Sequence, residues 1–416
     1  MKYSLGQLFA YGLFGLPLAL VALPVYVMVP QLYATQLGMP LAIVGAVLLA
    51  ARVLDAFIDP WLGRWIDRAR QRRGYVGFVL LALPPLLGGF IALFYPPDTG
   101  GAALIAWFGA SLVLVYLGYS MATIAHNSWG ASLTQERGER SRLTAVREGC
   151  ALGGVVMAAV LPMLAGMDAL SIAFALLLLT TAVLLWRLAP RASASDDTSA
   201  HNDVHGAGWL APLAGRRFRW LFGVFAVNGI AAAIPATLFL FFAADRLQLP
   251  QHAGTFLLMY FGAAALTLPL WSRLASRMGE ARAWLGAMVL AIAAFAWTAM
   301  LGAGDLVPFA LVCIATGAAL GADLALPPAL LAGVIGDAGH AGAREGSYFG
   351  LWSWMTKMNL ALAAGIALPL LEWLGYSPGT TDAGGLAALS VAYALLPCAL
   401  KAGAAMLLWK APLHDI

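Results

Sequence analysis

Apolar stretches of 18 or more residues recur from one end of this 416-residue chain to the other. Each is long enough to cross a membrane as a helix. A chain that is 62% hydrophobic and only 11% charged does not have the composition of a water-soluble globular domain. We therefore expect an all-α, multi-pass membrane protein with about twelve spans. The expected spans are residues 8–33, 41–66, 75–95, 102–129, 143–166, 168–188, 217–243, 251–275, 281–302, 306–333, 345–373 and 386–409.

Basic residues gather in alternate connections between these spans. Arginines crowd residues 64–73 and 137–142, and they flank the segment 187–219. The opposite connections carry acids such as Asp98 and only one basic residue, Arg246. This positive-inside pattern predicts that both termini are cytoplasmic. The arginines that set this topology also account for the basic pI of about 9.0, so no nucleic-acid partner is expected.

One polar segment divides the chain. Residues 190–215 are rich in Ser, Asp and His and predict a flexible cytoplasmic linker between domains 1–189 and 216–416. The connections at residues 63–74 and 271–282 are alike and follow the second span of each half. Such a repeat is typical of a transporter built from two pseudo-symmetric six-helix bundles. No nucleophile–base set, metal motif or nucleotide motif is present in the sequence, so neither an enzyme nor a cofactor is expected.

Two carboxylates interrupt the second apolar stretch. Asp55 and Asp59 are four residues apart and share a helix face with Arg52. Charges at bilayer depth are costly and generally have a function. Two adjacent carboxylates disfavour double ionisation unless a cation is present, which suits Na⁺ or a proton. In the alternative interpretation, Arg52 neutralises one acid in a purely structural ion pair.

The fourth and fifth spans add polar side chains. Ser120, Thr123 and Asn127 lie on one helical stripe, where a hydroxyl would complete a cage of oxygen ligands. Hydrogen bonding between helices is the alternative. Arg147, at the start of the fifth span, either reaches into a cavity or pairs with Glu148 near the membrane surface.

The second half contains its own buried polar residues. Lys357 lies deep in the eleventh span and Asp323 in the tenth. Lys357 is expected either to pair with Asp323 or to face the two carboxylates of the second span. Asn228 offers a hydrogen bond to a substrate, whereas Lys401 is expected near the membrane interface.

The connection after the second span carries Asp67 and Arg68 in a Gly-x-x-x-Asp-Arg pattern. Asp67 at a helix end, paired with a neighbouring arginine, would form a contact that locks one conformation. The alternative is that these charges only set topology.

The run Arg-x-x-Asp-Ala-x-x-Asp-Pro-x-x-Gly-x-x-x-Asp-Arg at residues 52–68 resembles the glycoside–pentoside–hexuronide:cation symporters. These form the melibiose-permease-like branch of the major facilitator superfamily, to which the lysophosphatidylcholine symporters are related. The resemblance implies that Asp55 and Asp59 hold Na⁺, Li⁺ or H⁺ and that Ser120 supplies a hydroxyl ligand. It further implies that Lys357 lies beside the cation site and Arg147 near the sugar.

The chain also departs from the pattern of the sugar permeases. Their Lys-Asp pair in the first span is replaced by Leu16 and Pro17. Thr123 stands where they have a sugar-binding aspartate, and Asn127 where they have a sugar-stacking tryptophan. Cation coupling is therefore expected, but α-galactoside specificity is not.

These observations together predict a Na⁺- or H⁺-coupled secondary symporter that moves a small polar solute by alternating access. A glycoside or a sugar acid is the expected substrate, and a lysolipid or another amphipathic molecule is the alternative. A membrane enzyme or a non-transporting sensor is less favoured. The expected location is a bacterial inner membrane, with the bilayer and the small-molecule substrate as partners and a monomer as the functional unit.

Overall fold

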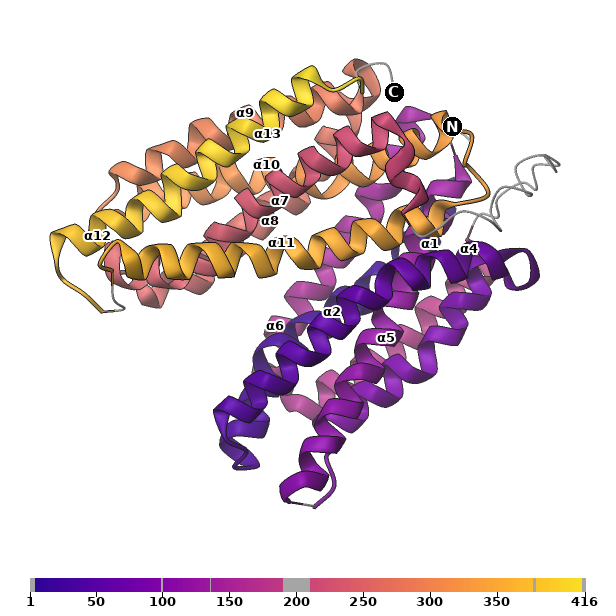
Figure 1. Ribbon diagram of the computed structural model, residues 1–416, viewed down its shortest axis with the longest axis horizontal. Helices are drawn as coiled ribbons and strands as arrows, with labels where there is room; N and C mark the ends of the chain where they lie inside the picture. Colours follow the sequence, from indigo (N-terminus) through magenta and orange to yellow (C-terminus); the bar gives the residue numbers. More distant parts are fainter. Residues whose placement is uncertain (1–3, 99, 135, 190–209, 377–378, 414–416) are drawn as a thin grey trace. The chain divides into compact units, whose positions relative to one another are not determined.

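A computed structural model describes residues 4–98, 100–134, 136–189, 210–376 and 379–413. These residues are almost entirely helical, and none of them lies in a β-strand. The helices are α1 (Leu5–Gly12), α2 (Gly15–Leu23), α3 (Val29–Gln31), α4 (Leu41–Phe94), α5 (Gly101–Leu133), α6 (Arg137–Leu188), α7 (Arg216–Phe241), α8 (Ala253–Met278), α9 (Glu280–Ala296), α10 (Leu306–Asp337), α11 (Glu345–Trp373), α12 (Ala383–Ser390) and α13 (Leu396–Lys410) (Figure 1).

The helices have the length and composition of membrane spans. Ten helical segments among the described residues are long and apolar enough to cross a membrane. Two further helical segments of comparable length, the first arm of α4 and the whole of α11, bring the total to the expected twelve. Large apolar side chains such as Leu266 and Trp373, each 82% exposed, remain on the outside, where lipid would cover them. The prediction of an all-α, multi-pass membrane protein is confirmed.

Single glycines allow the chain to turn between consecutive spans. α4 and α6 each contain two spans, joined at Gly74 (φ 64°) and Gly166 (φ 82°). Gly279 (φ 90°) joins α8 to α9 in the same way. Only glycine adopts such positive φ angles without a steric cost. Gly74 and Gly279 each lie within one of the two similar connections, so both connections turn at a glycine with positive φ, although not at the same position.

Wide π-helical turns interrupt several spans. In the first span they occupy Pro24–Met28 and Leu32–Gln36. In the second half they occupy Phe242–Arg246, after α7, and Val391–Leu395, before α13. Such turns are rare and occur frequently at functional sites.

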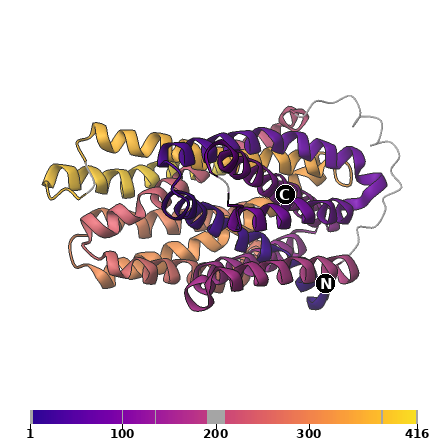
Figure 2. The ribbon, with the colours of Figure 1, turned by 90° about the horizontal axis from the view of Figure 1, so that it is seen from below.

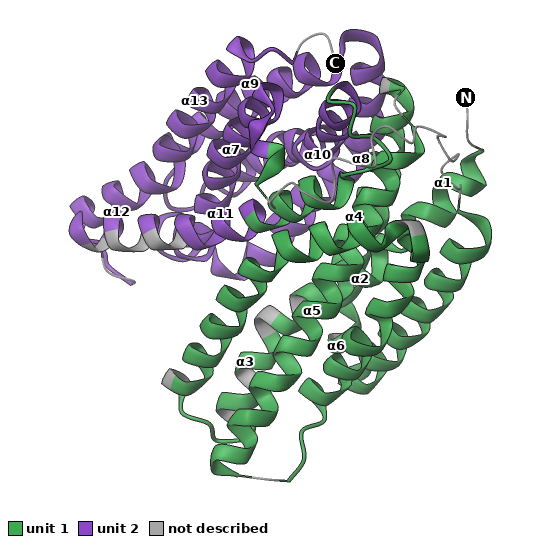
Figure 3. Ribbon diagram, turned by 45° about the vertical axis from the view of Figure 1, so that its right-hand side comes forward, with its two compact units in different colours: residues 1–212, 338–354 green, residues 213–337, 355–416 purple. Residues whose placement is uncertain are grey.

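The chain forms two compact units (Figure 3). Unit 1 consists of residues 1–212 and 338–354, and unit 2 of residues 213–337 and 355–416. The first ten residues of α11 therefore belong to unit 1 and the remainder to unit 2. The linker predicted at residues 190–215 lies mostly outside the described residues, and the domain limits 1–189 and 216–416 remain predictions.

Within each unit the helices run side by side along their lengths (Figures 1 and 2). In unit 1, α4 packs against α5 and α2 against α6. In unit 2, α8 packs against α10, and α13 packs against α7 and α9. The core of unit 2 is aromatic at its centre, with Phe242 stacked on Tyr393 at a ring separation of 4.1 Å and Phe256 edge-on to Phe309.

Candidate functional site

The two carboxylates of the second span are buried inside unit 1. Asp59 is fully buried and Asp55 is 7% exposed, and both lie on α4. Ser120, on the neighbouring helix α5, donates a hydrogen bond from Oγ to Oδ1 of Asp55 at 2.7 Å. The contact forms because α4 and α5 pack along much of their length, which brings the two polar stripes together. A carboxylate pair and a hydroxyl thus share one buried region, although their role in holding a cation remains a prediction.

The backbone of α4 offers a further oxygen atom, the carbonyl oxygen of Ala56, one residue after Asp55. Pro60 follows Asp59 inside the helix and has no amide hydrogen. The hydrogen bond that residue 60 would donate to the carbonyl of Ala56 is therefore missing. Carboxylate, hydroxyl and carbonyl oxygens are the ligands that hard cations prefer.

The remaining predicted residues of unit 1 lie on α4, α5 and α6. Arg52 is half-buried on α4. The buried hydroxyl of Thr123 forms no hydrogen bond to any described residue. Arg147 is 8% exposed, and its Nε donates to Oε1 of Glu148 at 3.0 Å while its Nη1 donates to Oδ1 of Asn127. Arg147 therefore makes the expected pair with Glu148 and also contacts the polar stripe of α5.

A second buried polar cluster lies in unit 2, and it corrects one expectation. Lys401, on α13, donates from Nζ to Oδ2 of Asp323 and to Oδ1 of Asn228, each at 2.8 Å. Asp323 also accepts hydrogen bonds at Oδ1 from Trp284 Nε1 at 2.6 Å and from Asn228 Nδ2 at 3.2 Å. The partner of Asp323 is thus Lys401 and not Lys357. The side chain of Lys401 is only 11% exposed, so it lies inside unit 2, and its expected position near the membrane interface remains a prediction.

Lys357 is half-buried on the unit 2 part of α11. Asp55 and Asp59 belong to unit 1. The predicted approach of Lys357 to the two carboxylates joins different units and remains a prediction.

Asp67 has a different partner from the one expected. Its carboxylate accepts hydrogen bonds from the backbone N–H groups of Gly346 (2.6 Å) and Ser347 (2.7 Å) and from Ser347 Oγ (2.5 Å). These groups form the first turn of α11, where the helix dipole favours a negative charge. Arg68 is exposed and contacts no acid among the described residues, so the pairing of Asp67 with Arg68 is wrong.

Burial raises the pKa of Asp67 to about 7, although the hydrogen bonds from Ser347 oppose the rise. Beside it lies Glu345, whose fully buried carboxylate accepts from Tyr75 Oη at 3.0 Å and from Arg70 Nη1 at 3.4 Å. Sequence analysis missed Glu345. Its position at the start of an apolar helix was the available signal, because an acid there suits the helix dipole.

Glycines bring α4 and α11 into direct backbone contact. A Cβ on Gly63 would lie 2.0 Å from the carbonyl oxygen of Gly346. A Cβ on Gly350 would lie 2.6 Å from the carbonyl oxygen of Asp59. No side chain fits at these points, and small residues at helix interfaces permit such close approach. We call the contact of Gly63 and Asp67 with residues 345–350 the α4–α11 contact.

Comparison with known proteins places these features in a family. Residues 5–415 match the MFS/sugar transport protein family. A glucuronide carrier protein homolog from Escherichia coli is 32% identical over 124 residues, which cover 28% of this chain and 26% of that protein. An uncharacterized symporter from Synechocystis is 31% identical over 137 residues, which cover 30% of this chain and 24% of that protein. The matched segments thus span about a quarter of these curated relatives.

Solved structures agree on the fold. A bacterial homologue of the iron transporter ferroportin superposes with a TM-score of 0.70 at 16% identity, covering 97% of this chain and 100% of that one. The major facilitator superfamily transporter FucP superposes with a TM-score of 0.66 at 16% identity, covering 97% of each chain. The fold is therefore the major facilitator fold, in agreement with the two-bundle prediction. The chain belongs to the MFS/sugar transport protein family, a family of transporters and not of enzymes, and its resemblance to the glycoside–pentoside–hexuronide:cation symporters is confirmed.

Proposed function

We propose that this chain is a cation-coupled secondary symporter and that Asp55, Asp59 and Ser120 hold the coupling ion. The observation that carries the proposal is the hydrogen bond from Ser120 to Asp55 beside the fully buried Asp59. Two ionised carboxylates in one buried region repel each other. A bound Na⁺, or a proton on one carboxylate, relieves that repulsion.

Coupling follows from the same electrostatics. Closing the protein around two ionised carboxylates as close in sequence as Asp55 and Asp59 is unfavourable, because their like charges repel each other at low dielectric. A cation removes this penalty and favours substrate binding nearby, so each ligand raises the affinity for the other. Na⁺ would be held by the carboxylates, the Ser120 hydroxyl and the Ala56 carbonyl, whereas a proton needs one carboxylate only.

The proposed substrate is a small polar solute such as a glycoside or a sugar acid. Relatives named as a putative glycoside/cation symporter and a putative sulfoquinovose importer support this class. Thr123 offers a hydroxyl, and the buried guanidinium of Arg147 offers donors that suit a sugar carboxylate. Asn228, Asp323 and Lys357 are retained as substrate or coupling residues of unit 2.

A lysolipid or other amphipathic substrate is the second candidate. It is favoured by Leu16, Pro17 and Thr123 at the positions where the sugar permeases carry polar or acidic groups. A cavity with fewer sugar-gripping acids costs less to fill with an apolar group.

The α4–α11 contact is the proposed conformational lock. Three hydrogen bonds hold Asp67 on the first turn of α11, and they have to break before residues 345–350 can leave α4. Transport would proceed by alternating access in a bacterial inner membrane, with both termini cytoplasmic and the monomer as the functional unit.

Proteoliposomes containing the full chain test the proposal. Uptake of radiolabelled methyl β-glucuronide and of lysophosphatidylcholine is measured with an inward Na⁺ gradient, an inward H⁺ gradient or neither. We expect a gradient to drive uptake of one probe, and Asp55→Asn and Asp59→Asn to abolish that dependence. Asp98→Asn changes an acid outside the spans and is the control. Full gradient-driven uptake by both carboxylate variants would refute the coupling role.

Cation binding is measured separately in detergent. Saturation at about 100 times the dissociation constant stabilises the folded state by about 2.7 kcal/mol. We expect Na⁺ at constant pH to raise the unfolding temperature of the native chain and the Asp98→Asn control but not of Asp59→Asn. If the coupling ion is a proton, a fall in pH should raise it less in Asp59→Asn than in the other two proteins. Equal responses in all three proteins would remove these carboxylates from the cation site.

A further inference from the structure

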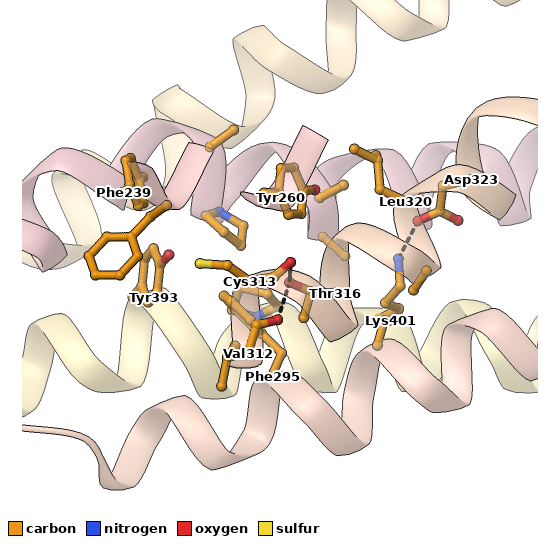
Figure 4. A pocket seen from close by; sticks show the side chains of 18 of the residues that line it. Phe239, Tyr260, Phe295, Val312, Cys313, Thr316, Leu320, Asp323, Tyr393 and Lys401 are labelled. Atoms are coloured by element: carbon orange, nitrogen blue, oxygen red, sulfur yellow. Dashed lines mark hydrogen bonds and ion pairs between the residues drawn. The ribbon is translucent and has the colours of Figure 1, made fainter. Parts of the chain in front are cut away.

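A cavity of about 420 Å³ lies inside unit 2, between α7, α8, α9, α10 and α13 (Figure 4). Its volume is that of a small-molecule binding pocket. Apolar and aromatic side chains form most of the wall, among them Phe239, Phe295 and Val312. Two lining residues are also exposed at the surface of the protein, Leu240 on α7 (63%) and Leu257 on α8 (38%).

One end of the cavity is polar but carries no net charge. Lys401 and Asp323 form part of the lining there and neutralise each other through their 2.8 Å contact (Figure 4). An ammonium group has three donors, and those of Lys401 are directed at two acceptors, Asp323 and Asn228. One donor is therefore available at the edge of an otherwise apolar chamber.

Two tyrosine hydroxyls add to this polar character. Tyr393, in the π-helical turn before α13, is 3% exposed, and Tyr260 lies on the opposite wall in α8 (Figure 4). Within the described residues neither hydroxyl has a hydrogen-bond partner. A hydroxyl that lines a cavity and has no protein partner generally meets water or a ligand there. The aromatic stacking of Tyr393 on Phe242 holds its ring in place beside the cavity.

We propose that this cavity binds an uncharged, ring-containing amphipathic molecule whose oxygen acceptors receive hydrogen bonds from Tyr260, Tyr393 and Lys401. A charged ligand would compete with the Lys401–Asp323 pair and lose its hydration against apolar walls. A bare acyl chain would leave both hydroxyls without partners. A free sugar would leave most of its own hydroxyls without partners. Flat apolar rings suit a wall built from phenylalanines.

The site is distinct from the proposed cation site, because all its lining residues belong to unit 2. It does not depend on transport of a glycoside, and its test needs no transport assay. Failure of cation coupling would leave the proposal intact.

Equilibrium dialysis of the full chain in lipid nanodiscs tests the ligand class with three probes of one shape. 2-Acetonaphthone is uncharged and has an acceptor, 2-ethylnaphthalene lacks the acceptor, and 2-naphthoate is charged. Relative to empty nanodiscs, we expect one saturable site for the ketone. Binding of the other two probes should be at least fivefold weaker, which is the typical effect of losing a buried hydrogen bond.

Two tyrosine variants locate the site. Tyr393→Phe and Tyr260→Phe should each weaken ketone binding about fivefold and leave 2-ethylnaphthalene unaffected. Tyr33→Phe is the matched control, because Tyr33 is a buried tyrosine of unit 1 whose hydroxyl has no hydrogen-bond partner in the described part of the chain. Equal binding of the ketone and the hydrocarbon, or no effect of either cavity variant, would overturn the proposal in favour of a hydrocarbon chain.

The native cysteines give a readout that needs no substitution. Cys313 and Cys398 line the cavity, whereas Cys150 is half-buried in unit 1. N-Ethylmaleimide labelling, followed by mass spectrometry of peptides, should be slowed by the ketone at Cys398 and remain unchanged at Cys150. If saturating ketone leaves the labelling rate of Cys398 unchanged, the ligand binds elsewhere and the proposal is overturned.

Discussion

Removal of one partner from the buried Lys401–Asp323 pair should cost much more than removal of both. At 2.8 Å and an effective dielectric constant of about 20, the gross attraction between the two charges is about 6 kcal/mol. Desolvation of the two groups, which are 11% and 13% exposed, offsets part of this energy. Lys401→Met leaves the Asp323 carboxylate buried with two neutral donors, Asn228 and Trp284. We expect a loss of about 3 kcal/mol in the free energy of unfolding, at the low end for a broken buried pair.

A double-mutant cycle measures the coupling. Asp323→Leu leaves an unpaired ammonium and should cost a similar amount, whereas the double variant Lys401→Met/Asp323→Leu should recover at least about 2 kcal/mol of the summed losses. The free energy of unfolding is measured by reversible denaturation with SDS in mixed micelles. The matched control is the same cycle with Lys357→Met, for which we expect coupling below about 0.5 kcal/mol. Additive losses in the Lys401 cycle, or strong coupling of Asp323 to Lys357, would contradict the assignment of the pair.

Three further predictions concern unit 1. The pKa of Asp67 is raised to about 7, so burial favours its protonated form in the folded protein. The stabilisation of the α4–α11 contact by this protonated form is complete below about pH 4, and it is lost as the pH rises through 7. Hydrogen exchange at Gly346, corrected for intrinsic rates, should therefore be faster at pH 8 than at pH 5, and Asp67→Asn should remove the difference. Gly63→Ala forces a Cβ against the backbone of α11 and should lower the free energy of unfolding, measured by thermal unfolding, by about 1–3 kcal/mol. Gly45 lies on the same helix with open space around it, so Gly45→Ala should not lower the free energy of unfolding in this way. Ser120→Ala should weaken cation binding about fivefold in the thermal assay, and unchanged binding would show that its hydroxyl is not a ligand.

The sequence was sufficient to predict the spans and the residues that share one helix. Apolar length determines a span, and the four-residue spacing of Asp55 and Asp59 determines their common face. Ser120 was also predicted, from its polar stripe and from the resemblance to the symporter family, and its hydroxyl does lie 2.7 Å from Asp55.

Contacts between distant helices were not predictable in the same way. Lys357 and Lys401 both interrupt apolar helices, and nothing in a single sequence shows which helix lies beside Asp323. The choice depends on how α10 and α13 are rotated in unit 2. Likewise, the Gly-x-x-x-Asp-Arg pattern places Asp67 at a helix end, but its neighbours in sequence are arginines and its partners lie 279 and 280 residues away.

The glycine turns have a consequence for how the protein is made. Since both arms of α4 are spans, the chain reverses at Gly74 within a residue or two, and α6 does the same at Gly166. Such hairpins can enter the bilayer as pairs, with each arm covering part of the other's polar surface during insertion. A residue that blocks the turn should therefore lower the yield of inserted protein more than the activity of the molecules that mature.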